Sequence, residues 1–508
     1  MKTAALCVEW VSVTNVRFPS TGSRTNVRAL PRLLTAWRSL SMNHKTIDIV
    51  IVGGGFSGVL AAKILADHAL NVLVIDENIN LGGQFLRSYP NQSATESLSP
   101  LKRFGLQSIK ALDQKRIRIM TRTEVLGITA EREMLIRQVG KKLFTARPRA
   151  VLLATGAREK FIPFKGWTLP GVISTGATQI LLKGSRVLPS NKILIGGAGI
   201  FPYAVASEIL MNNGQVMGIL DQNRLVEKMA FAAGLFHEKS KIGEGNRYLA
   251  KLIVYRTPIK FGVRIMEAHG EKGLEGVLTA KVDRNGRSLP GSEKVYSCDC
   301  LAVGYGFVAN IELAQLAGCR LEYDASRGGW IVGVTGDLQT SVDGIFAAGE
   351  ITGVAGATKS VTEGKLAALA ILLKLGKISR EAFISHSGRL KKARKRQRRF
   401  GSYFNRLHKT PQEIIRSIAD ETIVCRCEDI TMGEIKTAIS NGCATPDAVK
   451  KAVRSGMGIC QGRTCSPMIH AVIAARLGTP ADQLTPLSVR TPLKAVPLKE
   501  LAGPISAL

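Results

Sequence analysis

The chain has 508 residues, of which 45% are hydrophobic, and its formal net charge is +31 at pH 7. This length predicts about three to four domains, each with its own core. No apolar run reaches the roughly twenty residues that a bilayer-spanning helix needs, so we expect no transmembrane segment. The charge is high for a metabolic enzyme and favours an acidic protein partner, nucleic acid or an anionic membrane surface.

The first 44 residues differ in composition from the rest of the chain. Residues 1–44 contain six Lys and Arg residues and one acid, Glu9, and they include no nucleotide-binding pattern. This composition is typical of a transit peptide. The alternative, which we favour, is a start codon assigned too early, with Met42 just before the first predicted strand. In both interpretations the segment lies outside the predicted fold.

A glycine-rich turn ends the first predicted strand, in the sequence IDIVIVGGGFSG. Gly53 permits the tight turn, Gly55 lets the backbone approach a pyrophosphate, and Gly58 lets the next helix pack close to the strand. A second strand ends about twenty residues later at Asp76, whose carboxylate can accept hydrogen bonds from a ribose. Strand, turn, helix and terminal acid together predict a dinucleotide-binding domain.

A second unit of the same kind begins at NKILIGGAG and ends at Asp221. Gly197 and Gly199 take the first two glycine positions, but Pro202 takes the third. Proline is tolerated in a first helical turn, although the close packing that glycine permits is lost. The pattern predicts a second dinucleotide fold and leaves open whether it binds NAD(P). If it does, Asp221 favours NAD, because a carboxylate repels a 2′-phosphate.

Two further apolar strands end in glycine turns of the kind that approach a nucleotide. AVLLATGA ends at Thr155 and Gly156, and GIFAAGEI ends at Gly349 and Glu350. A stretch of helical composition, VTEGKLAALAILLKL, comes after the second of these strands. The N-terminus of that helix is placed to stabilise the partial negative charge of a flavin.

Four of the nine cysteines form a metal-like pattern near the C-terminus. Cys425 and Cys427 are followed after thirty-two residues by Cys460 and Cys465. Four thiolates suit a [2Fe-2S] cluster, and the glycines around the last pair let backbone amides turn toward the sulfurs. Structural zinc is the alternative, although zinc knuckles more often use C-x₂-C pairs. Disulfides are disfavoured, because clustered thiols in a large chain favour a reducing compartment.

A basic run, RLKKARKRQRR, occupies residues 389–399. We expect a solvated helix that docks an acidic face of a protein partner, with Lys391, Arg394 and Arg398 among the contacts. Nucleic-acid binding is the alternative. It is disfavoured because no recognisable nucleic-acid-reading fold accompanies the charge.

The nucleotide patterns as a set resemble the flavoprotein disulfide reductase superfamily, whose members have two dinucleotide-binding domains. The matching motifs are GGGFSG with Asp76, GGQ at 82–84, ATG at 154–156, the second glycine turn and TSVDGIFAAGE at 340–350. The resemblance covers about residues 45–375. It implies an α/β fold in which the first domain binds FAD and a second Rossmann-like domain is inserted within it.

The resemblance also implies which residues surround the cofactors. Gly83 and Gln84 would lie beside the flavin, and Glu350, where the superfamily usually has Asp, would lie near the ribityl chain. The candidate cofactor-binding residues are Gly53, Gly55, Ser57, Gly58, Asp76, Gly83, Gln84, Val125, Thr155, Gly156, Gly197, Gly199, Asp221, Gly349 and Glu350. No close cysteine pair follows Gln84, and we interpret Cys298 and Cys300 as packing residues, so thiol–disulfide chemistry is not expected.

The C-terminal cysteine region is similar to the bacterioferritin-associated-ferredoxin-like (BFD-like) [2Fe-2S] domain, which implies that Cys425, Cys427, Cys460 and Cys465 are the cluster ligands. With the phrase LAVGYGFVANIELAQLAGC, the chain as a whole resembles the large subunits of opine, D-hydroxyproline and sarcosine-type dehydrogenases and of the cyanide-forming glycine dehydrogenase. That group implies a second FAD-containing subunit of the D-amino-acid-oxidase type and a small [2Fe-2S] subunit as partners.

The expected domains are an N-terminal extension over 1–44, an FAD-binding domain over 45–165 and 330–380, a second dinucleotide-binding domain over 166–329, a basic helical linker over 381–418, a small, mainly helical [2Fe-2S] domain over 419–480, and a tail over 481–508. The expected function is oxidation of a C–N bond in an amino acid or opine by a heteromeric, cytoplasmic or membrane-peripheral dehydrogenase. The alternatives are a stand-alone NAD(P)H-dependent reductase and a non-catalytic assembly or iron-handling module. The sequence indicates no general acid or base.

Overall fold

The computed structural model describes residues 47–87, 99–112, 116–235 and 240–508. The N-terminal extension expected over 1–44 lies outside the described residues. Among the helices of the described part, none is both long and apolar enough to cross a bilayer.

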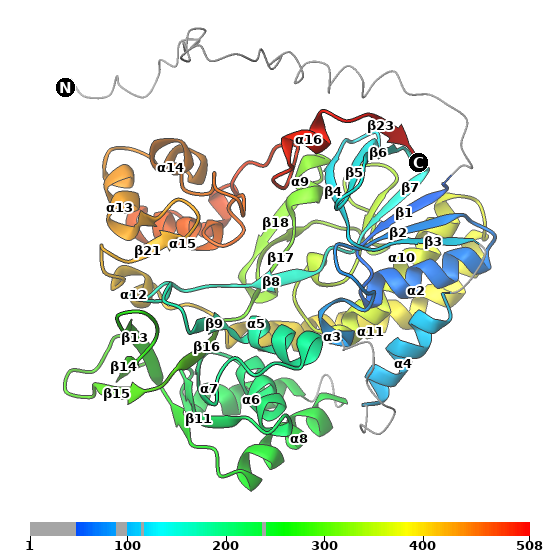
Figure 1. The fold of residues 1–508 in the computed structure, drawn as a ribbon. Helices are drawn as coiled ribbons and strands as arrows, with labels where there is room; N and C mark the ends of the chain where they lie inside the picture. Colours follow the sequence, from blue (N-terminus) through cyan, green and yellow to red (C-terminus); the bar gives the residue numbers. More distant parts are fainter. Residues whose placement is uncertain (1–46, 88–98, 113–115, 236–239) are drawn as a thin grey trace, which may run out of the picture. The chain divides into compact units, whose positions relative to one another are not determined.

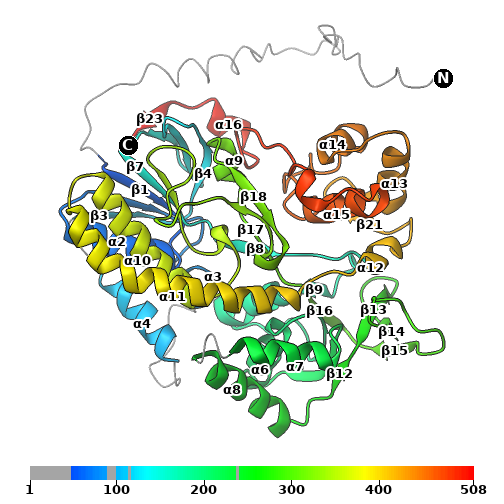
Figure 2. The same ribbon diagram turned by 180° about the vertical axis from the view of Figure 1, so that it is seen from behind.

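The first sheet has five parallel strands in the order β20-β7-β1-β2-β3. They are β1 (Ile49–Val52), β2 (Val72–Ile75), β3 (Ile117–Met120), β7 (Ala150–Leu153) and β20 (Ile345–Ala347). Strand β1 is apolar throughout because both of its faces are covered. Ile49 and Ile51 pack with the helices α2 (Phe56–Asp67) and α10 (Ala357–Lys374). The view from behind shows these two helices beside the first sheet (Figure 2). Val50 and Val52 face the opposite layer.

That opposite layer is a smaller sheet in the order β23-β6-β5-β4. Its strands are β4 (Thr123–Ile128), β5 (Met134–Gln138), β6 (Leu143–Ala146) and β23 (Ile505–Ala507). The C-terminal strand β23 pairs in parallel with β6, so the end of the chain returns to the first sheet unit (Figure 1). Two short helices, α3 (Gly83–Leu86) and α4 (Pro100–Lys110), follow β2.

The second sheet is also parallel, in the order β12-β11-β10-β16-β9. Its strands are β9 (Val172–Ser174), β10 (Lys192–Gly197), β11 (Gln215–Asp221), β12 (Ile259–Phe261) and β16 (Cys300–Gly304). Its helices are α5 (Thr175–Ile180), the π-helical turn η1 (Leu181–Ser185), α6 (Phe201–Met211), α7 (Leu225–Gly234) and α8 (Ser240–Val254). An antiparallel sheet of β13 (Val263–His269), β14 (Gly276–Lys281) and β15 (Lys294–Ser297) packs beside it.

The two parallel sheets are joined by a pair of crossing segments. We call the part of the chain around the first parallel sheet the first unit and the part around the second parallel sheet the second unit. Strand β8 (Ala157–Glu159) leaves the first unit and pairs antiparallel with β17 (Phe307–Ala309), which returns from the second unit. The return passes through α9 (Glu312–Leu316) and the hairpin of β18 (Leu321–Asp324) and β19 (Gly329–Val332) before reaching β20. The second unit is therefore inserted between strands of the first.

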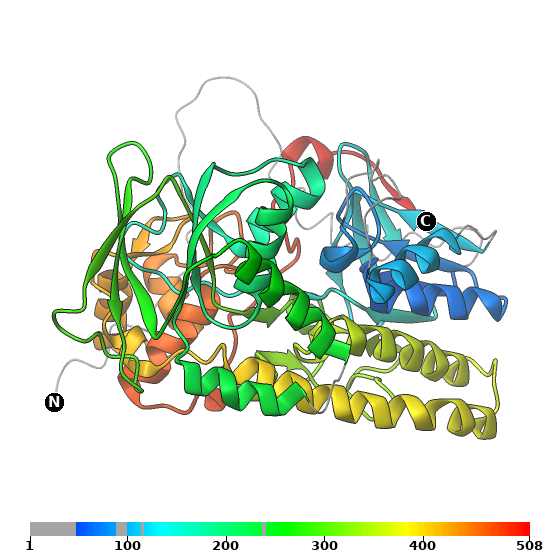
Figure 3. The same cartoon turned by 90° about the horizontal axis from the view of Figure 1, so that it is seen from below.

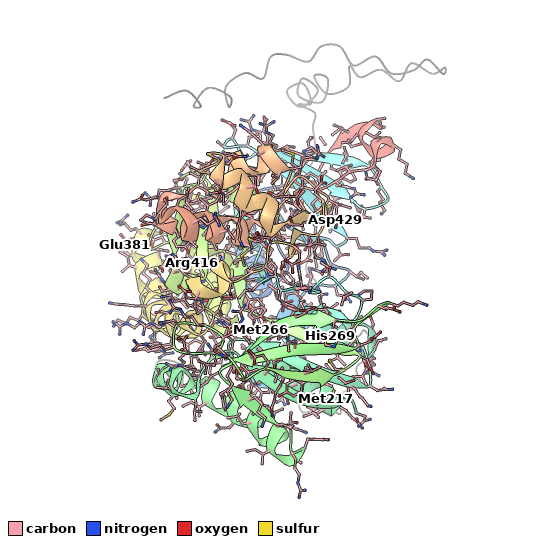
Figure 4. The ribbon with its side chains drawn as sticks, turned by 90° about the vertical axis from the view of Figure 1, so that its left-hand side faces the viewer. Met217, Met266, His269, Glu381, Arg416 and Asp429 are labelled. Carbon is pink, nitrogen blue, oxygen red and sulfur yellow. The ribbon has the colours of Figure 1, made fainter. Side chains whose placement is uncertain are left out.

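The helix α11 (Arg380–Arg406) lies beside α10, as the view from below shows (Figure 3). It leads to α12 (Gln412–Arg416), which lies between the second unit and the C-terminal helices. Arg416 donates to the carbonyl oxygen of Ala475 (3.3 Å), and Ser417 accepts from Arg264 on β13 (2.9 Å). Figure 4 labels Arg416 together with Met266 and His269 of β13.

The C-terminal segment is mainly helical. It contains β21 (Ile423–Cys425), β22 (Ile430–Thr431), α13 (Met432–Ser440), α14 (Pro446–Val453), α15 (Ser466–Leu477) and α16 (Leu498–Leu501). Helix α13 begins with a reciprocal capping box between Thr431 and Glu434. Three 3₁₀ turns complete the described elements: η3 (Ala325–Arg327), η4 (Glu350–Thr352) and η5 (Ala481–Gln483).

Candidate redox site

The first glycine turn has the geometry that its sequence predicts. Gly53 has a φ of +111°, and a Cβ there would lie 2.2 Å from the carbonyl oxygen of Ala154. A Cβ at Gly58 would lie 1.9 Å from the carbonyl oxygen of Gly53. By contrast, the nearest atom to a Cβ at Gly55 is 3.9 Å away, so the space in front of this glycine is open. The turn is closed where strand and helix meet and open where a phosphate would lie.

Asp76 lies at the end of β2 beside this turn. Its carboxylate accepts hydrogen bonds from the amide of Gly54 (2.7 Å) and from the amide and side chain of Asn78 (both 2.8 Å). These bonds fix the carboxylate at the mouth of the turn, where a ribose would meet it.

A cavity of about 2380 Å³ opens over the carboxyl ends of the first sheet. Of the cofactor-binding residues predicted from the sequence, those lining this cavity are Gly53, Gly55, Ser57, Asp76, Gly83, Gln84, Val125, Thr155, Gly156, Gly349 and Glu350. Gly58, Gly197, Gly199 and Asp221 do not line it. The structure thus brings the first nucleotide pattern and the strand ends of β7 and β20 to one site. The glycines and the terminal acid of the second pattern lie outside it, although Phe201 and Tyr203 of the helix that follows those glycines line the cavity.

Buried charges hold the turn that follows β20. Glu363 of α10 accepts from the amide of Gly349 (2.8 Å) and the hydroxyl of Thr352 (2.7 Å). Lys359 donates to the carbonyl oxygens of Gly349 (2.7 Å) and Gly353 (2.8 Å), and its ammonium lies 3.1 Å from the Glu363 carboxylate. Both side chains are about 1% exposed or less. Although burial opposes ionisation, Lys359 and a neighbouring arginine lower the pKa of Glu363 to about 2, so the carboxylate is ionised.

Glu350 lies at the same turn and closes it from the other side. Its carboxylate accepts from the amides of Ala355 (3.3 Å) and Gly356 (3.1 Å), just before α10 begins. Burial raises the pKa of Glu350, and Lys359 opposes this effect. Gly356 lines the cavity, so the N-terminus of an eighteen-residue helix points at the site. The open glycine, the ribose-side acid and this helix end fit a bound FAD.

The four patterned cysteines come together as two pairs. The sulfur of Cys425 interacts most strongly with that of Cys465, and the sulfur of Cys427 with that of Cys460, while weaker charge interactions link the two pairs. In the described part of the chain, no three His, Cys, Asp or Glu side chains surround a single metal-ion position. Two pairs fit a two-iron cluster, which takes two thiolates at each iron, better than they fit one zinc ion.

Backbone amides point at these sulfurs. The hydrogen bond from Cys465, followed by amides that include those of Gly456 and Glu428, lowers the pKa of Cys425 to about 6. Burial raises the pKa of Cys460, but amides of Gly462 and Thr464 outweigh it, and the net pKa is lowered. Amides that favour thiolates are the environment that an iron–sulfur cluster needs.

The cluster loop meets the flavin-side strand end. Ile459 and Arg463, on either side of Cys460, line the same cavity as Gly53 and Gly349. Arg158, three residues after Thr155, donates to the carbonyl oxygen of Arg463 (2.9 Å). Its guanidinium also pairs with Glu312 (2.7 Å). The loop that carries Cys460 and Cys465 therefore forms part of the wall of the flavin cavity.

Several residues of the site were not predicted from the sequence. Arg158 and Glu159 come just after the strand predicted to end at Thr155 and Gly156. Their position next to this strand end could have indicated that they belong to the site. Glu159 lines the cavity and accepts from Thr175 (2.7 Å) and the amide of Gly176 (2.9 Å), and burial raises its pKa. Lys359 and Glu363 are opposite charges spaced one helical turn apart, which is a recognisable pattern in a sequence.

The expectation that Arg394 contacts a partner is wrong. Its guanidinium is 8% exposed and lies 2.8 Å from the buried carboxylate of Glu363. Lys391 is exposed but pairs with Asp337 (2.6 Å). The run contains an inward-facing stripe because a helix turns every 3.6 residues. The cysteines interpreted as packing residues, Cys298 and Cys300, are 1% and 2% exposed, and burial raises the pKa of each.

These features define an electron-transfer oxidoreductase with a dinucleotide cavity and an adjoining two-pair cysteine site. The family model of pyridine nucleotide-disulphide oxidoreductases matches residues 47–368, and that of the BFD-like [2Fe-2S] binding domain matches residues 423–475. The chain belongs to the pyridine nucleotide-disulphide oxidoreductase family and carries a C-terminal BFD-like domain. FAD and a [2Fe-2S] cluster, the cofactors expected from the sequence, are confirmed by these two matches.

Known proteins resemble the chain over most of its length. The A subunit of opine oxidase from Rhizobium meliloti is 31% identical over 470 residues, which cover 90% of this chain and 87% of that protein. Hydrogen cyanide synthase subunit HcnB of Pseudomonas aeruginosa is 30% identical over 430 residues, 82% of this chain and 90% of the relative. The crystal structure of L-proline dehydrogenase from P. horikoshii is 20% identical, covers 92% of this chain and 81% of its own, and has a TM-score of 0.64. The expected α/β fold with two Rossmann-like units and a small helical [2Fe-2S] domain is confirmed.

Proposed function

We propose that this chain is the FAD- and cluster-carrying subunit of a heteromeric dehydrogenase that oxidises a C–N bond of an amino acid or opine. The observation that carries the proposal is that the cluster loop and the flavin turn line one cavity. The names of the relatives, the opine oxidase A subunit and hydrogen cyanide synthase subunit HcnB, support the substrate class and the multi-subunit assembly. The proposed partners are a second FAD-containing subunit of the D-amino-acid-oxidase type and a small [2Fe-2S] subunit.

The residues of this chain position two redox groups. A bound flavin accepts electrons in pairs and can release them singly, and a [2Fe-2S] cluster accepts one at a time. Lys359 and Glu363 fix the turn at Gly349, and the first turn of α10 directs its amides at the cavity. Arg158 ties the strand end of β7 to the cluster loop. Cys425 and Cys465 are buried, which limits access of water to the cluster.

A reducing compartment such as the cytoplasm is the proposed location. None of the eight cysteines in the described part of the chain takes part in a disulfide bond. A disulfide-free set of this size is typical of a compartment in which thiols stay reduced.

The exposed cations of α11 are the proposed contact with an acidic partner. They are Arg389, Lys392, Lys395, Arg396 and Arg399. Charge reversal of Lys392 and Arg396 should weaken co-purification with that partner at low salt. The same reversal at Lys141 and Lys142, two exposed residues between β5 and β6, is the matched control and should leave co-purification unchanged. Equal recovery of the partner with both double variants would contradict this contact.

The decisive experiment mixes the co-purified complex anaerobically with candidate opines and amino acids and follows the flavin and cluster spectra. We expect the flavin to bleach first and the cluster signal to appear after it. The same mixture with the isolated chain should show neither change, because the proposed oxidation occurs in the partner. Reduction of neither group in the complex by any C–N substrate would refute the proposal.

A further inference from the structure

The second sheet has its topological switch between β10 and β16, because β11 lies on one side of β10 and β16 on the other. In open parallel sheets a nucleotide binds in the crevice outside the carboxyl ends of the strands at this point. Gly199 follows β10 and Gly306 follows β16, so these two glycines border the crevice. In the first sheet the corresponding crevice lies between β1 and β7, and Gly53 and Thr155 there line the flavin cavity.

The imidazole of His408 fills the second crevice. A Cβ at Gly199 would lie 1.9 Å from its Nε2 atom, and a Cβ at Gly306 would lie 2.6 Å from its Cγ atom. His408 is 6% exposed, and the ring of Phe404 packs on it with the centroids 4.4 Å apart. Burial, helped by two nearby lysines, lowers the pKa of His408 to about 3, so the ring is neutral. The open space found at Gly55 is absent at Gly199.

Hydrogen bonds hold this end of α11 in the crevice. Asn223 donates from its side chain to the carbonyl oxygen of Leu407 (2.9 Å), and Lys160 donates to the carbonyl oxygen of His408 (2.5 Å). The side-chain oxygen of Asn223 accepts from the amide of Gly199 (2.8 Å). That amide belongs to the group that would face a pyrophosphate, and it is already paired with the protein.

The ribose-side acid of the second unit is also engaged. Asp221 is 2% exposed and accepts from the hydroxyl of Tyr203 (2.6 Å), the ammonium of Lys228 (2.6 Å) and the amide of Asn223 (2.9 Å). Lys228 donates in addition to the carbonyl oxygen of Gly199 (2.5 Å). A nucleotide would have to displace a buried ion pair and a hydroxyl to reach this carboxylate, whereas Asp76 accepts from amide groups of Gly54 and Asn78.

We propose that the second dinucleotide fold is a socket for the end of α11 and does not bind NAD(P), with His408 in the position that the pyrophosphate would take. Neither Gly199 nor Asp221 lines the flavin cavity, whereas Tyr203 and Lys228, which cover Asp221, line its wall. The sequence, with Pro202 at the third glycine position, does not determine whether the second fold binds NAD(P). The crevice occupied by His408 favours the absence of NAD(P) binding. The inference does not depend on the proposed substrate, and it means that NADH and NADPH do not supply electrons to the flavin of this chain.

The test uses the full chain with its flavin and cluster, titrated anaerobically with NADH and NADPH. We expect no saturable binding by equilibrium dialysis and no flavin bleaching at millimolar nucleotide. Saturable binding of either nucleotide to the unaltered chain would overturn the proposal. This arm needs no variant, and its outcome is separate from the test with amino acids and opines.

A second arm opens the socket. The double variant His408→Ala/Lys228→Ala should bind NADH at least tenfold more tightly than the unaltered chain. His386→Ala is the matched control, since His386 is an exposed histidine of α11, the helix that His408 follows, and it should leave NADH binding unchanged. Equal binding by the double variant and the control, in protein whose flavin content shows that it is folded, would contradict the assignment of His408 and Lys228 as the blocking residues.

Discussion

Arg158 and Arg463 are 305 positions apart in the chain, and the guanidinium of the first donates a hydrogen bond of 2.9 Å to the carbonyl oxygen of the second. The same guanidinium contacts Asn310 (2.8 Å) and Glu312 (2.7 Å), which lie on the segment returning from the second unit. Arg158 therefore fixes the cluster loop relative to the strand end beside the flavin.

Replacement of Arg158 by Ala should slow electron passage from flavin to cluster by about ten- to a hundredfold, since a misplacement of about 1 Å has effects of this size. The rate of flavin bleaching by substrate should stay the same. Stopped-flow spectra of the complex separate the two rates. Arg158→Lys should recover part of the loss, and Arg147→Ala, at an exposed arginine, should have no effect. An equal fall of both rates would contradict a positioning role.

Replacement of any of the four paired cysteines should remove the cluster. We expect Cys425→Ser and Cys460→Ser to lose iron and the cluster absorption while they keep FAD, because each iron would lose one of its two thiolates. Cys443→Ser is the control, since this cysteine is buried outside the two pairs. Iron and flavin analysis of purified protein decides the question. Full iron content in Cys460→Ser would sink the assignment of that ligand.

Glu363→Gln should lower the free energy of unfolding by about 3–5 kcal/mol, because it leaves two buried cations without their shared carboxylate. Those cations are Lys359 and Arg394. FAD affinity should also fall, as Glu363 holds the amide of Gly349. Chemical denaturation and flavin release measure the two effects, and Glu293→Gln at an exposed position is the control. A loss below about 1 kcal/mol would show that the network contributes little.

The same carboxylate gives a pH dependence of stability. The folded pKa of Glu363 is about 2 against an ordinary value of 4.5. Because the folded pKa is the lower one, the stabilisation is present above pH 4.5 and is lost as the pH falls through 2. Its full size is about 3 kcal/mol. Between these pH values the free energy of unfolding should change less steeply with pH in Glu363→Gln than in the unaltered chain, and equal slopes would contradict the assignment.

The parts of the site that the sequence predicted are local. The roles of Gly53, Gly58 and Asp76 depend on a strand, a turn and a helix that are neighbours in the chain, so spacing alone carries the geometry. The cysteine pattern could be predicted for a similar reason, although its division into Cys425 with Cys465 and Cys427 with Cys460 depends on how the segment folds.

The parts that the sequence missed depend on long-range contacts or on helical phase. Nothing near His408 indicates that it meets Gly199, more than two hundred positions away. The prediction for Arg394 rests on the charge of its neighbours. This residue nevertheless lies seven and eleven residues after Ser387 and Phe383, which are buried on the same face of α11, so the helical period predicts an inward position.

Helix α11 has a consequence for how the molecule loses its structure. Its middle is anchored to the first unit through Arg394, and its end is anchored to the second through His408. If the first unit unfolded alone, His408 would no longer be held in the crevice of the second unit. If the second unit unfolded alone, the end of α11 would lose its packing, and the buried ion pair of Arg394 and Glu363 would be weakened. Two folds that could in principle open as separate foldons are thereby coupled, and calorimetry should show them unfolding in one cooperative transition.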